Sequence, residues 1–123
     1  MENEKKLIIL VDDNPANLRI GKNVLSEKYT VLTAPSASKL FYLLQTNRPN
    51  LILLDVDMPH TDGYAAIQTL KSITENKNIP VIFLTAMNDP ESEKKGRSLG
   101  AVDYVRKPFD PPSLIECIEQ YIL

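Results

Sequence analysis

Short apolar runs alternate with longer segments of mixed polarity along this 123-residue chain. Three of the runs, Leu7–Val11, Leu51–Leu54 and Val81–Leu84, are uninterrupted and rich in Leu, Ile and Val, as expected of strands covered on both faces. Two further runs, Tyr29–Ala34 and Val102–Arg106, mix polar with apolar residues, which is typical of strands near the edge of a sheet. The pattern therefore predicts five strands.

Segments with helical signals follow each of these strands. Asp13 or Asn14 with Pro15 opens the first segment and Ser36 opens the second, because short polar side chains cap helices and proline fits the first turn. The fourth segment is the least apolar, and Gly100 suits the left-handed residue that ends many helices. Apolar residues at helical spacing mark the inward faces of the other four: Leu18, Val24, Leu25; Leu40, Leu43, Leu44; Ala66, Ile67, Leu70, Ile73; Leu114, Ile115, Ile118, Ile122.

Strict alternation of strands and helices predicts an α/β fold with a parallel sheet and helices on both faces. The uninterrupted first, third and fourth strands are expected at the centre and the other two at the edges, which favours the order 2-1-3-4-5. Residues 1–123 are expected to form a single flavodoxin-like (βα)5 domain, because this length matches one ordinary domain. Such sheets bind ligands at the carboxyl ends of their strands.

Polar residues follow four of the predicted strands. Asp12 and Asp13 come after the first strand, Asp55 after the third, Thr85 after the fourth and Lys107 after the fifth. Three carboxylates brought together repel one another and need a neutralising partner. Mg²⁺ suits them best, because this ion takes oxygen ligands and commonly bridges carboxylates to phosphate oxygens.

Asp55 is the expected phosphoryl acceptor in this crevice. It directly follows a buried strand that would hold its carboxylate at the floor, whereas Asp12 and Asp13 begin a loop. The ammonium of Lys107 and the hydroxyl of Thr85 add a positive charge and a hydrogen-bond donor. Transfer of a phosphoryl group to a carboxylate depends mainly on such positioning and charge neutralisation.

The chain resembles the receiver domains of two-component response regulators over essentially its whole length. Four segments that match in order carry the resemblance: Val11-Asp12-Asp13-Asn14; Leu54-Asp55-Val56-Asp57-Met58-Pro59 with Asp62-Gly63; Leu84-Thr85-Ala86; and Val105-Arg106-Lys107-Pro108-Phe109. The resemblance implies an aspartyl phosphate at Asp55, formed from the phosphohistidine of a sensor histidine kinase or phosphotransfer protein. It implies a phosphorelay switch that catalyses its own phosphorylation and dephosphorylation, and not a multiple-turnover enzyme.

The resemblance also assigns roles around the acceptor. It implies that Asp13, Asp55 and the backbone carbonyl of Asp57 hold Mg²⁺, with Mn²⁺ as the alternative, and that Asp12 acts through water. It further implies that Thr85 and Tyr104 form the switch: Thr85 turns toward the phosphoryl group, the ring follows, and the surface of the fourth helix, fifth strand and fifth helix changes. An edge-strand aromatic is the alternative interpretation of Tyr104. The Lys107-Pro108 bond is expected to be cis.

Asp57 departs from the commoner residues at its position in this family, which are uncharged. A fourth carboxylate near the crevice would alter cation binding, the approach of the donor or the attack of water on the acyl phosphate. We therefore expect an Asp57→Asn variant to keep Asp55 as acceptor and to change the lifetime of the phosphoryl group. The nearby His60 is interpreted as a rim or surface residue.

Composition limits the partners. A net charge of -2 and a pI near 5.4 give no field that would draw the domain onto nucleic acid or an anionic membrane. The longest purely apolar run, Leu7–Val11, is too short for a transmembrane helix or a signal-peptide core. The cytoplasm is thus the expected compartment, and a linked output domain and a phosphorylation-dependent homodimer are expected as further partners.

Three alternative functions remain open from the sequence. The segment from Leu51 to Asp57 also resembles the start of a haloacid-dehalogenase-type phosphatase, although Pro59 stands where that family expects Thr or Val. The same fold hosts flavin, but the first loop offers carboxylates where a phosphate-bearing cofactor needs glycine and amides. A receiver-like module that has lost phosphorylation is the third alternative.

Overall fold

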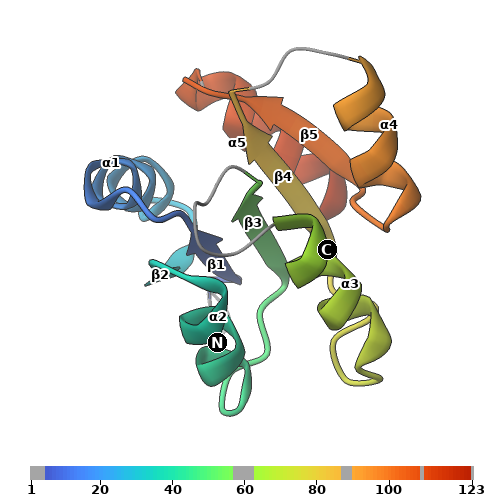
Figure 1. Ribbon diagram of the computed structural model, residues 1–123. Coiled ribbons are helices and arrows are strands. Elements are labelled where there is room, and N and C mark those ends of the chain that lie inside the picture. Colours follow the sequence, from blue (N-terminus) through green and yellow to red (C-terminus); the bar gives the residue numbers. More distant parts are fainter. Residues whose placement is uncertain (1–4, 57–62, 87–89, 109, 123) are drawn as a thin grey trace.

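The computed structural model describes residues 5–56, 63–86, 90–108 and 110–122 as alternating strands and helices (Figure 1). In chain order these are β1 Leu7–Val11, α1 Pro15–Leu25, β2 Thr30–Ala34, α2 Ala37–Leu44, β3 Leu51–Asp55, α3 Gly63–Ser72, β4 Val81–Thr85, α4 Pro90–Ser98, β5 Asp103–Arg106 and α5 Pro111–Tyr121. The strands form one parallel sheet in the order β2-β1-β3-β4-β5, as predicted.

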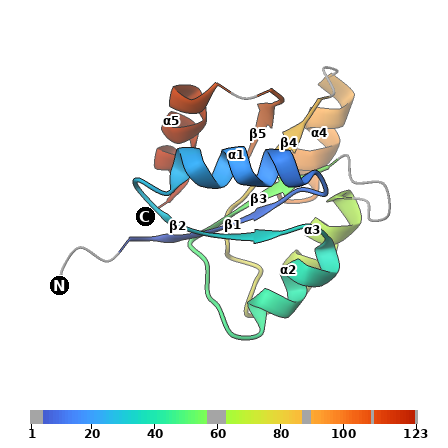
Figure 2. The same ribbon diagram turned by 90° about the vertical axis from the view of Figure 1, so that its left-hand side faces the viewer.

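Helices cover both faces of the sheet, with α1 and α5 on one side and α2 and α3 on the other (Figure 2). The sheet separates two hydrophobic cores, one on each face, and alternate residues of a strand belong to different cores because successive side chains point to opposite faces. Ile8 and Leu10 join the α1/α5 core, whereas Ile9 and Val11 join the core beneath α2 and α3. The helices on both faces and the three buried central strands confirm the expectation from the sequence.

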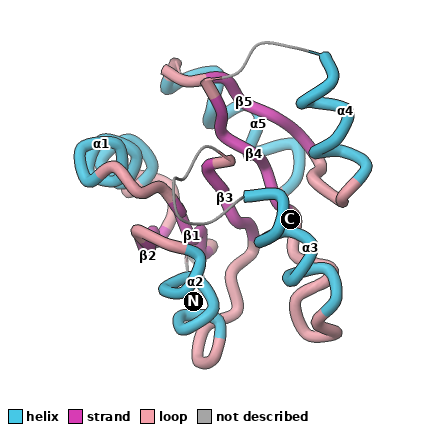
Figure 3. The backbone as a smooth tube through the Cα atoms, viewed as in Figure 1, coloured by secondary structure: helices cyan, strands magenta, loops and turns pink. Residues whose placement is uncertain are grey.

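Capping residues fix several helix ends as predicted. Asn14 caps α1 and accepts hydrogen bonds from the backbone of Ala16 and Asn17, while Ser36 and Asp110 cap α2 and α5. Gly100 follows α4 with a φ of 119°, a left-handed conformation that side chains other than glycine rarely adopt. Helix and loop segments alternate regularly around the sheet in Figure 3.

Both edge strands start one residue later than the sequence pattern suggests. The amide of Tyr29 donates to the carbonyl of Leu25 at 2.9 Å and so still belongs to the turn that ends α1. Among the described residues, no helix combines the length and apolar character needed to cross a bilayer.

Candidate functional site: an acidic pocket at the strand ends

The carboxyl ends of the strands meet at one edge of the sheet, where the predicted site residues lie. Asp55 and Thr85 are the last residues of β3 and β4, and Asp12 and Lys107 directly follow β1 and β5. The register pairs Asp55 with Leu84 and Thr85 with Arg106, so the strand ends are nearly level. Parallel pairing therefore brings together residues that are far apart in the chain.

Three carboxylates form the acidic pocket: Asp12, Asp13 and Asp55. One oxygen of each lies within 4.8 Å of the others. Asp12 and Asp55 are buried, with 2% and 1% of their surface exposed, whereas Asp13 is exposed. Buried carboxylates this close repel one another, so the pocket favours a cationic partner.

Lys107 supplies one positive charge to the acidic pocket. Its Nζ lies 3.1 Å from Oδ1 of Asp55 and 3.7 Å from Oδ2 of Asp12. The backbone positions this side chain, because the amide of Lys107 donates to the carbonyl of Thr85 at 2.7 Å. The following bond to Pro108 is cis, as expected. Within the part of the chain that the structure describes, one ammonium faces three carboxylates, so negative charge remains for a metal ion to neutralise.

Asp12 is held by α1 as well as by Lys107. Its Oδ1 accepts a hydrogen bond from the backbone of Asn14 at 3.0 Å, and its Oδ2 accepts one from Nδ2 of Asn17 at 3.2 Å. Asn17 was not singled out from the sequence, although its place in the first turn of the helix after Asp12 is the signal that could have found it. These bonds fix the orientation of the carboxylate before any ligand binds.

The oxygens of the acidic pocket fit a Mg²⁺ ion. Two oxygens bound to one Mg²⁺ at about 2.1 Å lie at most about 4.2 Å apart, so a spread of 4.8 Å requires side-chain shifts of a fraction of an ångström. The donor set, three carboxylates and no nitrogen or sulfur, is what a hard cation prefers. Asp13 and Asp55 would bind such an ion directly or through water, and Asp12 would bind it through water.

Thr85 and Tyr104 lie on adjacent strands behind the acidic pocket. Thr85 is fully buried, and Tyr104 is half-buried on β5, where it pairs in register with Phe83. The rings of Phe83 and Tyr104 contact each other edge to face, with centroids 6.4 Å apart. Because Phe83 and Thr85 are two residues apart on one strand, all three side chains belong to the same side of the sheet.

The structure thus brings Asp12, Asp13, Asp55 and Lys107 together and places Thr85 at the same edge of the sheet. The individual roles assigned to these residues and to Tyr104 stay predictions. Asp57 and His60 lie outside the described residues, so the fourth expected metal ligand is not placed.

Beside the acidic pocket lies an open hollow of about 340 Å³. It is lined by Asn17, Ile20, Ala86, Lys107 and Pro108. Ile20, which lines this hollow, is 54% exposed and is one of two exposed large hydrophobic residues in the described part of the chain. The hollow gives a second molecule access to the lysine that contacts Asp55.

Comparisons with known proteins agree with this geometry. A model of the response regulator receiver domain matches residues 8–119. The chain is 43% identical over 115 residues to the "Probable transcriptional regulator ycf27" of Cyanophora paradoxa, which covers 93% of this chain and 47% of that protein. It spans about half or less of the length of the first curated relatives that it matches.

Solved structures give the same result. The chemotaxis protein CheY4 of Vibrio cholerae has a TM-score of 0.91 at 25% identity, covering 95% of this chain and 98% of that one. The BeF3-activated receiver domain of DrrB has a TM-score of 0.83 at 31% identity, covering 95% and 97%. With the fold, the acidic pocket and the match over residues 8–119, the chain belongs to the response regulator receiver domain family.

Proposed function

We propose that residues 1–123 act as a receiver domain in which Asp55 accepts a phosphoryl group from the phosphohistidine of a histidine kinase or phosphotransfer protein. The observation that carries this proposal is the 3.1 Å contact between Lys107 Nζ and Asp55 Oδ1, within a cluster of three carboxylates. The lysine neutralises the acceptor and is in reach of oxygens on a transferred group. A receiver domain is a signalling module, and such domains pair with histidine kinases.

The chemical step is an in-line transfer of phosphorus from nitrogen to oxygen. A carboxylate oxygen of Asp55 attacks the phosphorus atom as the bond from phosphorus to the imidazole nitrogen breaks, and the electron pair of that bond returns to the ring. Lys107 offsets the negative charge that gathers on the phosphoryl oxygens. A Mg²⁺ ion held by Asp12, Asp13 and Asp55 would supply further charge neutralisation.

The surroundings of Asp55 support a donor that arrives as part of another protein. The carboxylate is 1% exposed, and the open hollow beside Lys107 offers a donor group a way toward it. The exposed Ile20 at the rim of that hollow offers an apolar anchor for a protein partner. Water then removes the phosphoryl group in a self-catalysed step, without multiple turnovers on a small substrate.

Phosphorylation would be transmitted through Thr85 and Tyr104 to the surface formed by α4, β5 and α5. Tyr104 already contacts Phe83 on the strand that ends at Thr85, which gives a packed connection between the acidic pocket and that surface. The relative from Cyanophora paradoxa carries a similar segment in a protein about twice as long. A linked output domain and a phosphorylation-dependent homodimer are thus part of the proposal.

Mass spectrometry tests the central claim. Incubation with Mg²⁺ and phosphoramidate is expected to add one phosphoryl group to the wild-type protein and none to Asp55→Asn, because the amide is a poor nucleophile. Asp110→Asn, which alters only the cap of α5, is the matched control and should label like the wild type. Absence of a Mg²⁺-dependent adduct on the wild type would refute the proposal, and repeated turnover of a phosphomonoester would favour the phosphatase alternative.

A further inference from the structure

The first turn of α3 lies directly against the backbone of the phosphoryl acceptor. A Cβ atom added to Gly63 would stand 2.6 Å from Cα of Val56 and 2.8 Å from the carbonyl oxygen of Asp55. Glycine is therefore required here for the close approach of two backbone segments. This turn is therefore in direct contact with the backbone at Asp55 and Val56.

The next residue, Tyr64, connects the same turn to α4. Its hydroxyl donates a hydrogen bond to the carbonyl oxygen of Ser92 at 3.3 Å. The ammonium of Lys95 lies over the Tyr64 ring, 4.5 Å from its centroid, at a distance typical of a cation–π contact. Two contacts from one side chain, a hydrogen bond and a cation–π contact, thus join the start of α3 to α4.

The Tyr64 ring also packs on the aromatic pair that leads to the switch residues. Its centroid lies 5.5 Å from that of Phe83 at an interplanar angle of 86°, and Phe83 in turn contacts Tyr104. A Cβ atom on Gly96 would stand 2.7 Å from the Phe83 ring, so α4 rests on this row of rings with no intervening side chain. A displacement of the rings is therefore transmitted directly to α4.

We propose that Tyr64 is a positioning residue of the phosphorylation switch, which holds α4 in its resting position through Ser92 and Lys95. The inference rests on the proposed function, because it concerns the same switch and names a residue outside Thr85 and Tyr104. A contact made in one state and lost in the other biases the equilibrium between them by its own free energy. Tyr64 thereby sets how strongly the domain resists activation.

A second lysine–tyrosine pair provides a matched control. On α2 the ammonium of Lys39 lies 4.9 Å from the centroid of the Tyr42 ring, which is 62% exposed. This contact has the same chemistry as that of Lys95 and Tyr64 but joins two residues of a single helix on the α2/α3 side of the sheet. Its loss should leave the switch unchanged.

The experiment is a titration with beryllofluoride, a phosphoryl mimic, in the presence of Mg²⁺, followed by NMR of the Gly96 and Tyr104 amides. A resting state that is easier to leave binds the mimic more tightly, because the apparent Kd falls as the competent fraction rises. Tyr64→Phe should lower the apparent Kd about threefold, as expected for loss of one hydrogen bond. Lys95→Met should lower it about twofold, as expected for a partly exposed cation–π contact.

Tyr42→Phe and Lys39→Met should bind with the wild-type Kd, and the Gly96 and Tyr104 amides of Tyr64→Phe should shift toward their liganded positions before any mimic is added. An unchanged or weaker affinity of Tyr64→Phe, even with a lowered melting temperature, would overturn the inference and leave the proposed function intact. Failure of the wild type to bind beryllofluoride with Mg²⁺ would overturn both.

Discussion

The two ends of β5 carry two different arrangements of carboxylates. At its carboxyl end, Lys107 faces the acidic pocket of three carboxylates, and its ammonium contacts two of them, Asp12 and Asp55. At its amino end the ratio is reversed, because the single carboxylate of Asp103 is surrounded by four donors. These are the Tyr104 amide at 2.8 Å, the Tyr121 hydroxyl at 2.9 Å, the Arg97 guanidinium at 3.1 Å and the Cys117 thiol at 3.4 Å.

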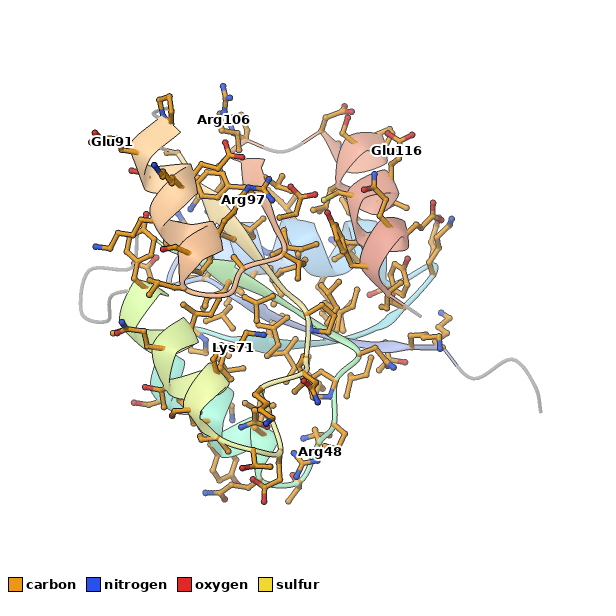
Figure 4. All side chains as sticks on the ribbon, turned by 90° about the vertical axis from the view of Figure 1, so that its right-hand side faces the viewer. Arg48, Lys71, Glu91, Arg97, Arg106 and Glu116 are labelled. Carbon is orange, nitrogen blue, oxygen red and sulfur yellow. The ribbon has the colours of Figure 1, made fainter. Side chains whose placement is uncertain are left out.

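The difference separates a ligand site from a structural site. Around Asp103 the donors come from α4, β5 and α5, and Figure 4 shows Arg97 on the face that these elements form. The carboxylate of Asp103 accepts hydrogen bonds from all four donors within the chain, so this cluster stabilises the packing of α4 and α5 against β5. Among the described residues, the acidic pocket has more carboxylates than cations, a balance that favours binding of a cation. The balance of donors and acceptors thus identifies which carboxylates are available for chemistry.

The largest expected effect is the low reactivity of Cys117. Burial, followed by the charge and hydrogen bond of Asp103, raises the pKa of this thiol to about 12. Because the thiolate is the nucleophile, alkylation by iodoacetamide at pH 8 should be at least about a hundredfold slower than for a free cysteine. Asp103→Asn should accelerate the reaction by removing two of the causes.

The urea-unfolded protein is the control for that measurement, because the same cysteine should then react at the ordinary rate. Rapid alkylation of the folded wild type would show that Asp103 and burial do not suppress the thiolate. Cys117 would then be more accessible to the reagent than its burial and its contact with Asp103 indicate.

Magnesium binding should distinguish the two arrangements by their response to the same substitution. Asp13→Asn removes a charge from the acidic pocket and should weaken Mg²⁺ binding. Loss of an outer-shell partner costs roughly tenfold to hundredfold in metal affinity, and the loss here should be at least that large. Asp103→Asn should leave the affinity unchanged, because its carboxylate is already saturated by the chain's own donors. Isothermal titration calorimetry would measure both, and equal losses of affinity would contradict the assignment of the two sites.

Most of the fold could be predicted from the sequence, because its uninterrupted apolar runs mark the strands that are buried on both faces. Leu51–Leu54 and Val81–Leu84 have no polar interruption and occupy the centre of the sheet, fully buried. The small error at Tyr29 arose because hydrophobicity does not distinguish the first residue of a strand from the buried end of a turn. Strand ends depend on hydrogen bonds that a pattern of side chains does not encode.

The acidic pocket was predictable for a related reason, since parallel strands in a known order bring their ends together. Asp12, Asp13, Asp55 and Lys107 needed no side-chain geometry to be grouped. The donors around Asp103 were not predictable, because Tyr121 lies 18 residues away and meets it only through the packing of α5 on the sheet. Such contacts depend on helix orientation, which alternating polarity leaves undetermined.

The smallest expected effect is on stability, and its pH dependence is diagnostic. Asp103→Asn should lower the free energy of unfolding by about 1–2 kcal/mol at pH 6, because charged hydrogen bonds become neutral ones. Burial raises the pKa of Asp103, but hydrogen bonds from Tyr104, Tyr121 and Cys117 and the charge of Arg97 outweigh it, so the pKa lies below its ordinary value of 3.8. The folded state therefore favours the ionised carboxylate.

A depressed pKa in the folded state contributes stability above the pKa of the unfolded chain, about 3.9, and that contribution is lost as the pH falls through the folded value. The gap between wild type and Asp103→Asn, measured by urea unfolding, should hence stay constant from pH 7 to 5 and shrink below pH 4. Glu116, on α5 in Figure 4, is exposed and has no hydrogen bond or ion pair among the described residues, so Glu116→Gln should show a gap near zero at every pH. A gap that stays constant below pH 3 would show that the donors around Asp103 do not depend on its charge.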